Sequence, residues 1–99
     1  MYIKDGIAYA GEEKKPIRVS SVRPLEDHML WVRFNTGEVK KVDMKPLLNA
    51  PAFVPLKDKK LFDSVYIEYG FPMWSGGDID IAPEYLHRNG ISISGDDVL

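Results

Sequence analysis

The chain has 99 residues, of which 44% are hydrophobic and 28% charged, and its 13 Lys and Arg and 15 Asp and Glu give a net charge of −2. This length fits one domain, and this composition excludes disorder of the whole chain. The absence of cysteine excludes disulfide bonds and thiolate metal sites.

No stretch is apolar enough for a signal peptide or for the helix of about 20 residues that crosses a bilayer. We therefore expect a soluble cytoplasmic protein with no membrane partner. The charge is uneven, since residues 14–60 carry eleven Lys and Arg against five Asp and Glu, and residues 61–99 carry one Arg against seven Asp and Glu. Such asymmetry arises from an interaction surface, or more often from two halves that interleave and compensate each other's charge.

Alternation of apolar and polar residues predicts β-strands separated by turns. In chain order, the predicted extended segments are 2–4, 7–9, 17–23, 29–34, 38–42, 65–69, 73–74 and 78–81. Asp5 and Gly6 favour a tight turn between the first two segments, so residues 1–16 form a hairpin extension. Val22 breaks the alternation of the third segment, which indicates a bulge or a strand end.

The clearest strand covers residues 29–34, because each of its two faces has a distinct character. Leu30, Val32 and Phe34 form an apolar face. The other face consists of Met29, Trp31 and Arg33. A turn that contains glycine joins this strand to the next one, so the two strands form a hairpin.

Short helices are predicted at three places, which are residues 44–48, 59–64 and 83–88. Asp43 and Asp58 are expected to cap the first two, since a carboxylate accepts hydrogen bonds from the first N–H groups of a helix. Pro83 starts the third helix, Gly90 ends it, and residues 91–99 form a loose tail or an edge strand. The predicted fold class is therefore α+β, with a small antiparallel meander sheet and two or three short helices.

A series of short motifs, each weak alone, follows in order from about Val19 to Leu86. The motifs are Val22-Arg23-Pro24-Leu25-Glu26-Asp27, Phe34-Asn35-Thr36-Gly37-Glu38-Val39, Asp43 with Pro46-Leu47-Leu48, Phe53-Val54-Pro55-Leu56, Leu61-Phe62, and Trp74, Gly77, Asp78, Asp80, Pro83 and Leu86. With this series, the chain resembles the domain-of-unknown-function family DUF2442 over about two-thirds of its length. The resemblance places the domain at residues 17–90, between the hairpin extension and the tail.

The resemblance implies a small α+β domain and does not imply an enzyme. Some relatives of this type carry an added helix-turn-helix segment and resemble transcription regulators, whereas others resemble partners of small toxin-like proteins. The nine residues after Gly90 cannot hold a helix-turn-helix segment. The resemblance therefore favours a partner of another small protein, in an antitoxin-like role.

Asp78, Asp80 and Glu84 come closest to a catalytic or metal-binding pattern. On a strand, positions i and i+2 point the same way, so Asp78 and Asp80 could share a divalent cation or act as an acid–base pair. The competing interpretation, which we favour, places Asp78 in a turn and Asp80 at the free N–H groups of the next helix. His28 and His87 lie apart in polar contexts and are expected to be exposed. We therefore predict no catalytic residue, no metal site and no cofactor.

Candidate partner-binding residues come from the aromatic and basic side chains. Trp74 is expected in the core more than at a surface. Trp31 lies on a strand whose other face is already apolar, so a helix or another chain could cover it. Lys40 and Lys41 begin a lysine-rich segment, 40–60, that could form one basic patch for nucleic acid. A lysine run is more often a solvated face that protects a sheet edge.

The predicted function is a non-enzymatic module that binds another protein in a regulatory or antitoxin-like role. The candidate contact residues are Trp31, Lys40, Lys41, Trp74, Asp78 and Asp80. Two alternatives stay open, namely a nucleic-acid-binding regulator that uses segment 40–60 and a metal-dependent enzyme that uses Asp78, Asp80 and Glu84. Self-association through an edge strand or through the Trp31 face is also compatible with the sequence.

Overall fold

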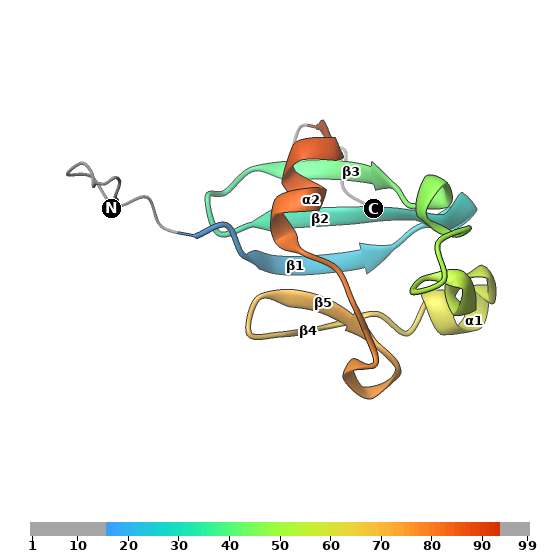
Figure 1. Ribbon diagram of the computed structural model, residues 1–99. Helices are drawn as coiled ribbons and strands as arrows, with labels where there is room; N and C mark the ends of the chain where they lie inside the picture. The colour runs from blue at the N-terminus through green and yellow to red at the C-terminus, as the bar shows by residue number, and fades with distance from the viewer. Residues whose placement is uncertain (1–15, 94–99) are drawn as a thin grey trace, which may run out of the picture.

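The computed structural model describes residues 16–93, which form two antiparallel sheets, two α-helices and four 3₁₀ turns (Figure 1). The predicted α+β class is therefore confirmed. The hairpin predicted within residues 1–16 lies outside the described residues, apart from Pro16. None of the helices in the described range is long and apolar enough to pass through a lipid bilayer.

The larger sheet, called sheet A, has the strand order β1-β2-β3-β7. Its strands are β1 (Val19–Pro24), β2 (Met29–Phe34), β3 (Val39–Asp43) and β7 (Ile91–Ser92). The strand predicted at 29–34 is confirmed, and β7 confirms an edge strand at the start of the C-terminal segment. The register of β1 against β2 shifts between Val19 and Ser21, which is the irregularity that the sequence indicated.

The smaller sheet, called sheet B, has the strand order β4-β5-β6. Its strands are β4 (Tyr66–Glu68), β5 (Phe71–Trp74) and β6 (Ile79–Asp80). The predicted meander is thus divided into two sheets, because the chain between β3 and β4 leaves the edge of sheet A and winds at its end (Figure 1). A backbone hydrogen bond of 2.8 Å from the Val19 N–H to the Gly70 carbonyl oxygen links β1 to the turn between β4 and β5.

The segment between the sheets contains the 3₁₀ turns η2 (Lys45–Leu47) and η3 (Val54–Lys57) and the helix α1 (Lys59–Phe62). The Asp58 carboxylate accepts a 3.0 Å hydrogen bond from the Lys60 N–H, so the predicted cap is confirmed. Asp43 accepts the corresponding bond, at 2.9 Å, from the Lys45 N–H. The helix expected after Asp43 is reduced to the single turn η2, in which Pro46 cannot donate a backbone hydrogen bond.

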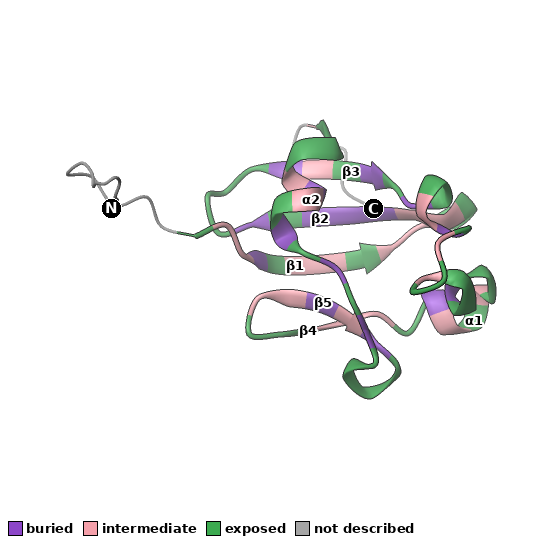
Figure 2. Cartoon of the chain, in the orientation of Figure 1, coloured by how far each residue is buried: buried purple, intermediate pink, exposed green. Residues whose placement is uncertain are grey.

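The hydrophobic core lies between sheet A, sheet B and the helix α2 (Pro83–Asn89), as Figures 1 and 2 show. Its members include Leu30, Val32, Phe34, Val42, Met44, Leu56, Phe62, Trp74, Ile79, Ile81 and Leu86. Leu86 is fully buried where α2 lies across sheet A, and burial of a leucine contributes about 1.5–3 kcal/mol. Trp31 and Val39 are 3% and 7% exposed but lie outside this core cluster.

Candidate functional site

Asp78, Asp80 and Glu84 are all exposed, and each comes from a different element. Asp78 follows the 3₁₀ turn η4 (Ser75–Gly77), Asp80 ends β6, and Glu84 lies in the first turn of α2. Because β6 contains two residues, Asp78 lies outside the strand, and the same-face argument does not apply to it. Among residues 16–93, no three His, Asp or Glu side chains are grouped in a way that could hold a metal ion.

The helix-capping role expected for Asp80 is wrong. Ala82 is the residue that precedes the first turn of α2, and no side chain accepts a capping hydrogen bond there. Asp80 lies two residues too early, because it is paired with Met73 of β5 in sheet B. Its carboxylate is therefore exposed beside the sheet, away from the free N–H groups of the helix.

Trp74 belongs to the core, so it is removed from the candidate contact residues. Its side chain is fully buried, and its ring stacks on that of Phe62 at a centroid distance of 6.1 Å. The indole N–H of Trp74 donates a 2.9 Å hydrogen bond to the Phe62 carbonyl oxygen. A ring with no exposed surface cannot meet a partner unless the domain opens.

The lysine-rich segment 40–60 does not form one surface. Lys40 and Lys41 are neighbours on β3, so they point to opposite faces of sheet A. The Lys40 ammonium donates a hydrogen bond to the His87 carbonyl oxygen in α2, whereas Lys41 is exposed on the other face. Lys45 forms ion pairs with carboxylates of this chain. The alternation of a strand already carried the signal that separates Lys40 from Lys41.

Trp31 lies on the face of sheet A opposite α2, which we call the outer face. Its cross-strand neighbours there are Arg23 of β1 and Lys41 of β3, and Arg33 follows two residues later on β2. The guanidinium carbons of Arg23 and Arg33 lie 5.9 and 5.4 Å from the centroid of the Trp31 ring, within range of a cation–π interaction. All three basic residues are exposed, so the outer face presents positive charge around a tryptophan.

The indole N–H of Trp31 is buried, and no hydrogen-bond acceptor reaches it in the described part of the chain. A buried donor without an acceptor typically costs about 1–3 kcal/mol, which makes such groups rare. Arg23, Arg33 and Lys41 likewise form no ion pair with a carboxylate of residues 16–93. The outer face therefore gathers four donor side chains for which the described residues supply no anion.

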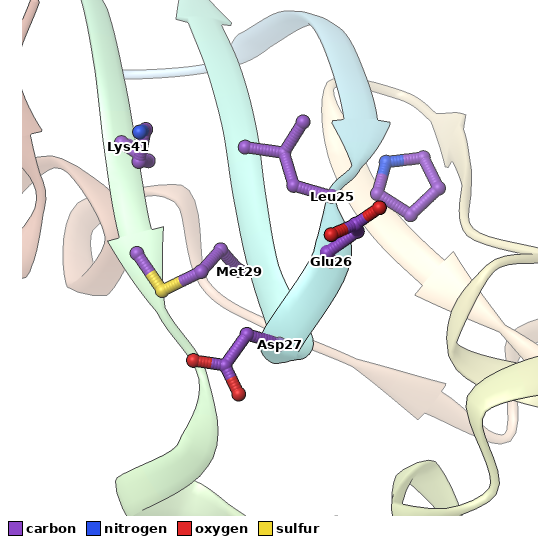
Figure 3. A pocket seen from close by; sticks show the side chains of 6 residues that line it. Leu25, Glu26, Asp27, Met29 and Lys41 are labelled. Carbon is purple, nitrogen blue, oxygen red and sulfur yellow. The ribbon is translucent and has the colours of Figure 1, made fainter.

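A hollow of about 640 Å³ opens on the outer face beside Lys41 (Figure 3). Its lining consists of Pro24, Leu25, Glu26, Asp27, Met29 and Lys41. Figure 3 shows Met29 and Lys41 on neighbouring strands, with Leu25 and Glu26 across from them. The lining of the hollow thus combines the apolar side chains of Leu25 and Met29 with three charged side chains.

The 3₁₀ turn η1 (Glu26–His28) forms one wall of the hollow, and Lys45 holds it in place. The Lys45 Nζ atom lies 3.0 Å from Asp27 Oδ2 and 3.2 Å from Asp43 Oδ1. The Asp27 hydrogen bond raises the pKa of Lys45, and the Lys45 backbone N–H lowers the pKa of Asp43. Asp27 and His28 have φ values of 63° and 55°, a left-handed conformation that few residues adopt without such support.

Both histidines were expected to be exposed, and both are half-buried. His28 Nε2 lies 2.9 Å from the Leu56 carbonyl oxygen, and the His28 ring packs 4.8 Å from that of Phe62. His87 Nε2 lies 2.7 Å from Glu38 Oε1. The two side chains therefore join separate parts of the fold, His28 from η1 to η3 and His87 from α2 to the turn before β3.

The Glu38–His87 contact predicts a pH-dependent stability. The His87 hydrogen bond, and then that from Thr36, lowers the pKa of Glu38 from its ordinary value of 4.5. A lowered carboxyl pKa stabilises the fold above the pKa of the unfolded chain, and this stabilisation is lost as pH falls through the folded value. The urea midpoint of Glu38→Gln should therefore lie below that of the unmodified chain at about pH 5, and the difference should shrink towards about pH 3.

A His87→Ala background supplies the control for this experiment. In this background, the decrease in the urea midpoint caused by Glu38→Gln should be smaller at every pH, because the hydrogen bond that lowers the Glu38 pKa most has been removed. A Glu38→Gln effect that is the same with and without the His87 ring would contradict the assignment.

Arg23, Arg33, Leu25 and Met29 were not among the residues predicted for a site. The alternation of β2 already placed Met29 and Arg33 on the same face as Trp31. The pairing of Arg23 with Trp31 depends on the register beyond the bulge, and the position of Leu25 depends on the left-handed turn η1. Neither of these two features has a clear signal in the sequence.

The comparisons with known proteins identify a family. Residues 19–92 match the family model described as "Protein of unknown function (DUF2442)". No curated protein and no solved structure matches the chain. The matched range runs from the first residue of β1 to the last residue of β7, so it contains both sheets and the outer face. Since it also covers well over half of the sequence, the chain belongs to the DUF2442 family.

Proposed function

We propose that this domain is a non-enzymatic protein-binding module and that its contact surface is the outer face of sheet A. The exposed basic side chains around Trp31 carry the proposal, because Arg23, Arg33 and Lys41 have no carboxylate partner among the described residues. The two arginines flank the Trp31 ring, which is itself buried beneath them. Tryptophan and arginine are the residue types most enriched at the centres of protein interfaces. A regulatory role beside another small protein is the form of this function that the family resemblance favours.

The surroundings of Trp31 also support a protein partner. Ile91 of β7 pairs with Lys41, lies on the same face, and is 72% exposed. The hollow lined by Leu25 and Met29 adds apolar surface on the other side of Lys41. Protein interfaces usually combine apolar contacts with hydrogen-bonding and charged groups, and both kinds lie side by side on this face. By contrast, a surface for nucleic acid requires many basic groups together, and the lysines of β3 are divided between two faces.

Reversing charge on the outer face tests the proposal. A tagged full chain is expected to recover a partner in stoichiometric amount from its native host, and the double variant Arg33→Glu with Lys41→Glu should lose it. Both residues are exposed, so the core is left intact. Arg88→Glu is the matched control, because Arg88 is an exposed residue of α2, on the other side of the sheet.

Quantitative mass spectrometry of the recovered proteins gives the result, and circular dichroism verifies that each variant is folded. Loss of the partner in the double variant, with retention in Arg88→Glu, is the outcome that we expect. Equal recovery by all three chains, or no stoichiometric partner for the unmodified chain, would rule the outer face out as the contact surface.

A further inference from the structure

We infer that the outer face binds an extended acidic segment of the partner protein, with a large apolar side chain next to its carboxylates. This inference rests on the proposed function, since it names the chemistry of the partner at the same surface. The groups that carry it are the three exposed cations around Trp31, namely Arg23, Arg33 and Lys41, and the adjoining hollow.

The side chains around Trp31 form a set of donors only. The two guanidinium groups and the ammonium group are exposed and can donate hydrogen bonds, and none of them can accept one, whereas the indole N–H is buried. Arg23 and Arg33 stack near the ring, Lys41 lies opposite it on β3, and the described residues supply no carboxylate to any of the three. Carboxylate and carbonyl oxygens are the complementary groups, and an arginine binds a carboxylate through two parallel hydrogen bonds.

The hollow specifies the second part of the segment. It shares Lys41 with the donor set and is lined by Leu25 and Met29, so an apolar side chain can enter it while a neighbouring carboxylate meets Lys41. Methionine adapts its shape to different side chains, which suits a pocket that takes Leu, Met or Phe. Burial of such a side chain adds about 1.5–3 kcal/mol before the costs of association.

The same surface is unsuited to nucleic acid. Binding to nucleic acid through phosphates grows with the number of phosphates that are neutralised, and the outer face offers only three basic groups near Trp31 among the described residues. Glu26 and Asp27 line the adjoining hollow, and Asp43 is exposed on the same face as Met29. These carboxylates would repel a continuous chain of phosphates, whereas a peptide can place its few carboxylates at the basic groups and its apolar residue over Leu25 and Met29.

A second copy of this chain is also a poor occupant. A symmetric dimer places the same patch on both sides of the interface. Arg23, Arg33 and Lys41 of both copies would then bring six cations into one interface, while Asp27 and Asp43 of this face are already paired with Lys45, which is unfavourable. The complement must come from a surface with the opposite charge.

Selection from a random dodecapeptide phage library on the immobilised full chain tests the inference. The selected sequences should be rich in Asp and Glu and should place Leu, Met or Phe next to them. A fluorescein-labelled peptide of the selected consensus then gives a dissociation constant by fluorescence anisotropy. Its twin with Asn and Gln in place of Asp and Glu should bind at least about tenfold more weakly. A neutral or basic consensus, or failure to select any peptide, would overturn the inference.

Variants of the chain locate the binding on the outer face. Lys41→Gln and Arg33→Gln should each weaken the acidic peptide by at least about fivefold, whereas Arg88→Gln should leave its affinity unchanged. Trp31→Phe removes a buried N–H that the peptide does not reach and keeps an aromatic ring, so the affinity should stay unchanged while the urea midpoint stays the same or rises. Equal affinity for all four variants would place the peptide elsewhere and contradict the inference.

Two outcomes separate this inference from the proposed function. Suppose that the charge-reversed variant loses the cellular partner but the library yields no acidic consensus. The outer face is then the contact surface, and the inference that its ligand is acidic is wrong. A labelled single-stranded dodecanucleotide is the other probe. If it binds through Arg33 and Lys41, with an affinity that falls steeply as salt increases, both the acidic peptide and the protein partner are wrong.

Discussion

Replacement of Trp74 by alanine is expected to lower the free energy of unfolding by about 3–5 kcal/mol. Trp74 is fully buried, stacks on Phe62 and donates its N–H to the Phe62 carbonyl oxygen. The ring comes from β5 and Phe62 from α1, so the substitution removes a contact between sheet B and the helical segment. A domain of this size has about 5–15 kcal/mol of stability in total, and the variant should be partly unfolded at 37 °C.

Urea denaturation followed by circular dichroism measures this effect, and two further variants identify its causes. Trp74→Phe keeps most of the apolar volume but leaves the Phe62 carbonyl oxygen without its donor, so about 1–3 kcal/mol should be lost. Trp31→Phe removes an N–H that has no acceptor among the described residues, and it should cost less than Trp74→Phe. A loss below about 1 kcal/mol for Trp74→Ala would show that the ring is not a centre of the core.

Local signals in the sequence were sufficient wherever a short segment determines its own structure. The strand β2 was predicted with its bounds, because three apolar residues on one face alternate with residues of a different character on the other. The Asp58 cap was predicted because a carboxylate at that position accepts the N–H of Lys60, two residues later. The bulge in β1 was visible as the phase break at Val22. Each of these features depends on a few adjacent residues.

Features that depend on distant residues could not be predicted in the same way. The division into two sheets depends on where the segment between β3 and β4 packs. The sequence of this segment predicts two short helices but does not indicate against which part of the fold they pack. The left-handed pair Asp27 and His28 depends on Lys45, which lies far along the chain. The hollow beside Lys41 exists because of that turn, so the candidate site was predicted through Trp31 and Lys41 alone.

Gly90→Ala is expected to lower the free energy of unfolding by about 1–3 kcal/mol because of crowding. The sequence correctly predicts that α2 ends at Gly90, but the usual reason, a left-handed conformation, does not apply, since φ is −80°. A Cβ atom at this position would lie 2.8 Å from the Leu86 carbonyl oxygen, 2.9 Å from Lys40 Cβ and 3.0 Å from Val42 Cγ2. The missing side chain therefore allows α2 to end close to β3.

Gly37 is the matched control, because its φ is +93° and a Cβ atom there would meet nothing within 4 Å. Gly37→Ala should cost about 1–2 kcal/mol through backbone strain, and Gly37→Asn should recover part of this loss because asparagine tolerates positive φ. At Gly90, asparagine adds atoms to a crowded place, so Gly90→Asn should be at least as destabilising as Gly90→Ala. Recovery of stability by Gly90→Asn in urea denaturation would contradict the crowding explanation.

The Gly90 variants also separate the two faces of sheet A. Moving the end of α2 away from β3 should disturb the hydrogen bond from Lys40 to the His87 carbonyl oxygen, which lies on the α2 side of the sheet. Trp31, Arg33 and Lys41 lie on the other side of the sheet, whereas the β3 atoms nearest to a Cβ atom at Gly90 are side-chain atoms of Lys40 and Val42, on the α2 side. Gly90→Ala, at a temperature where it remains folded, should therefore bind the selected acidic peptide with unchanged affinity, although its urea midpoint is lower. A parallel loss of stability and affinity would mean that the outer face depends on the packing of α2, and that charge on β2 and β3 is not sufficient for binding.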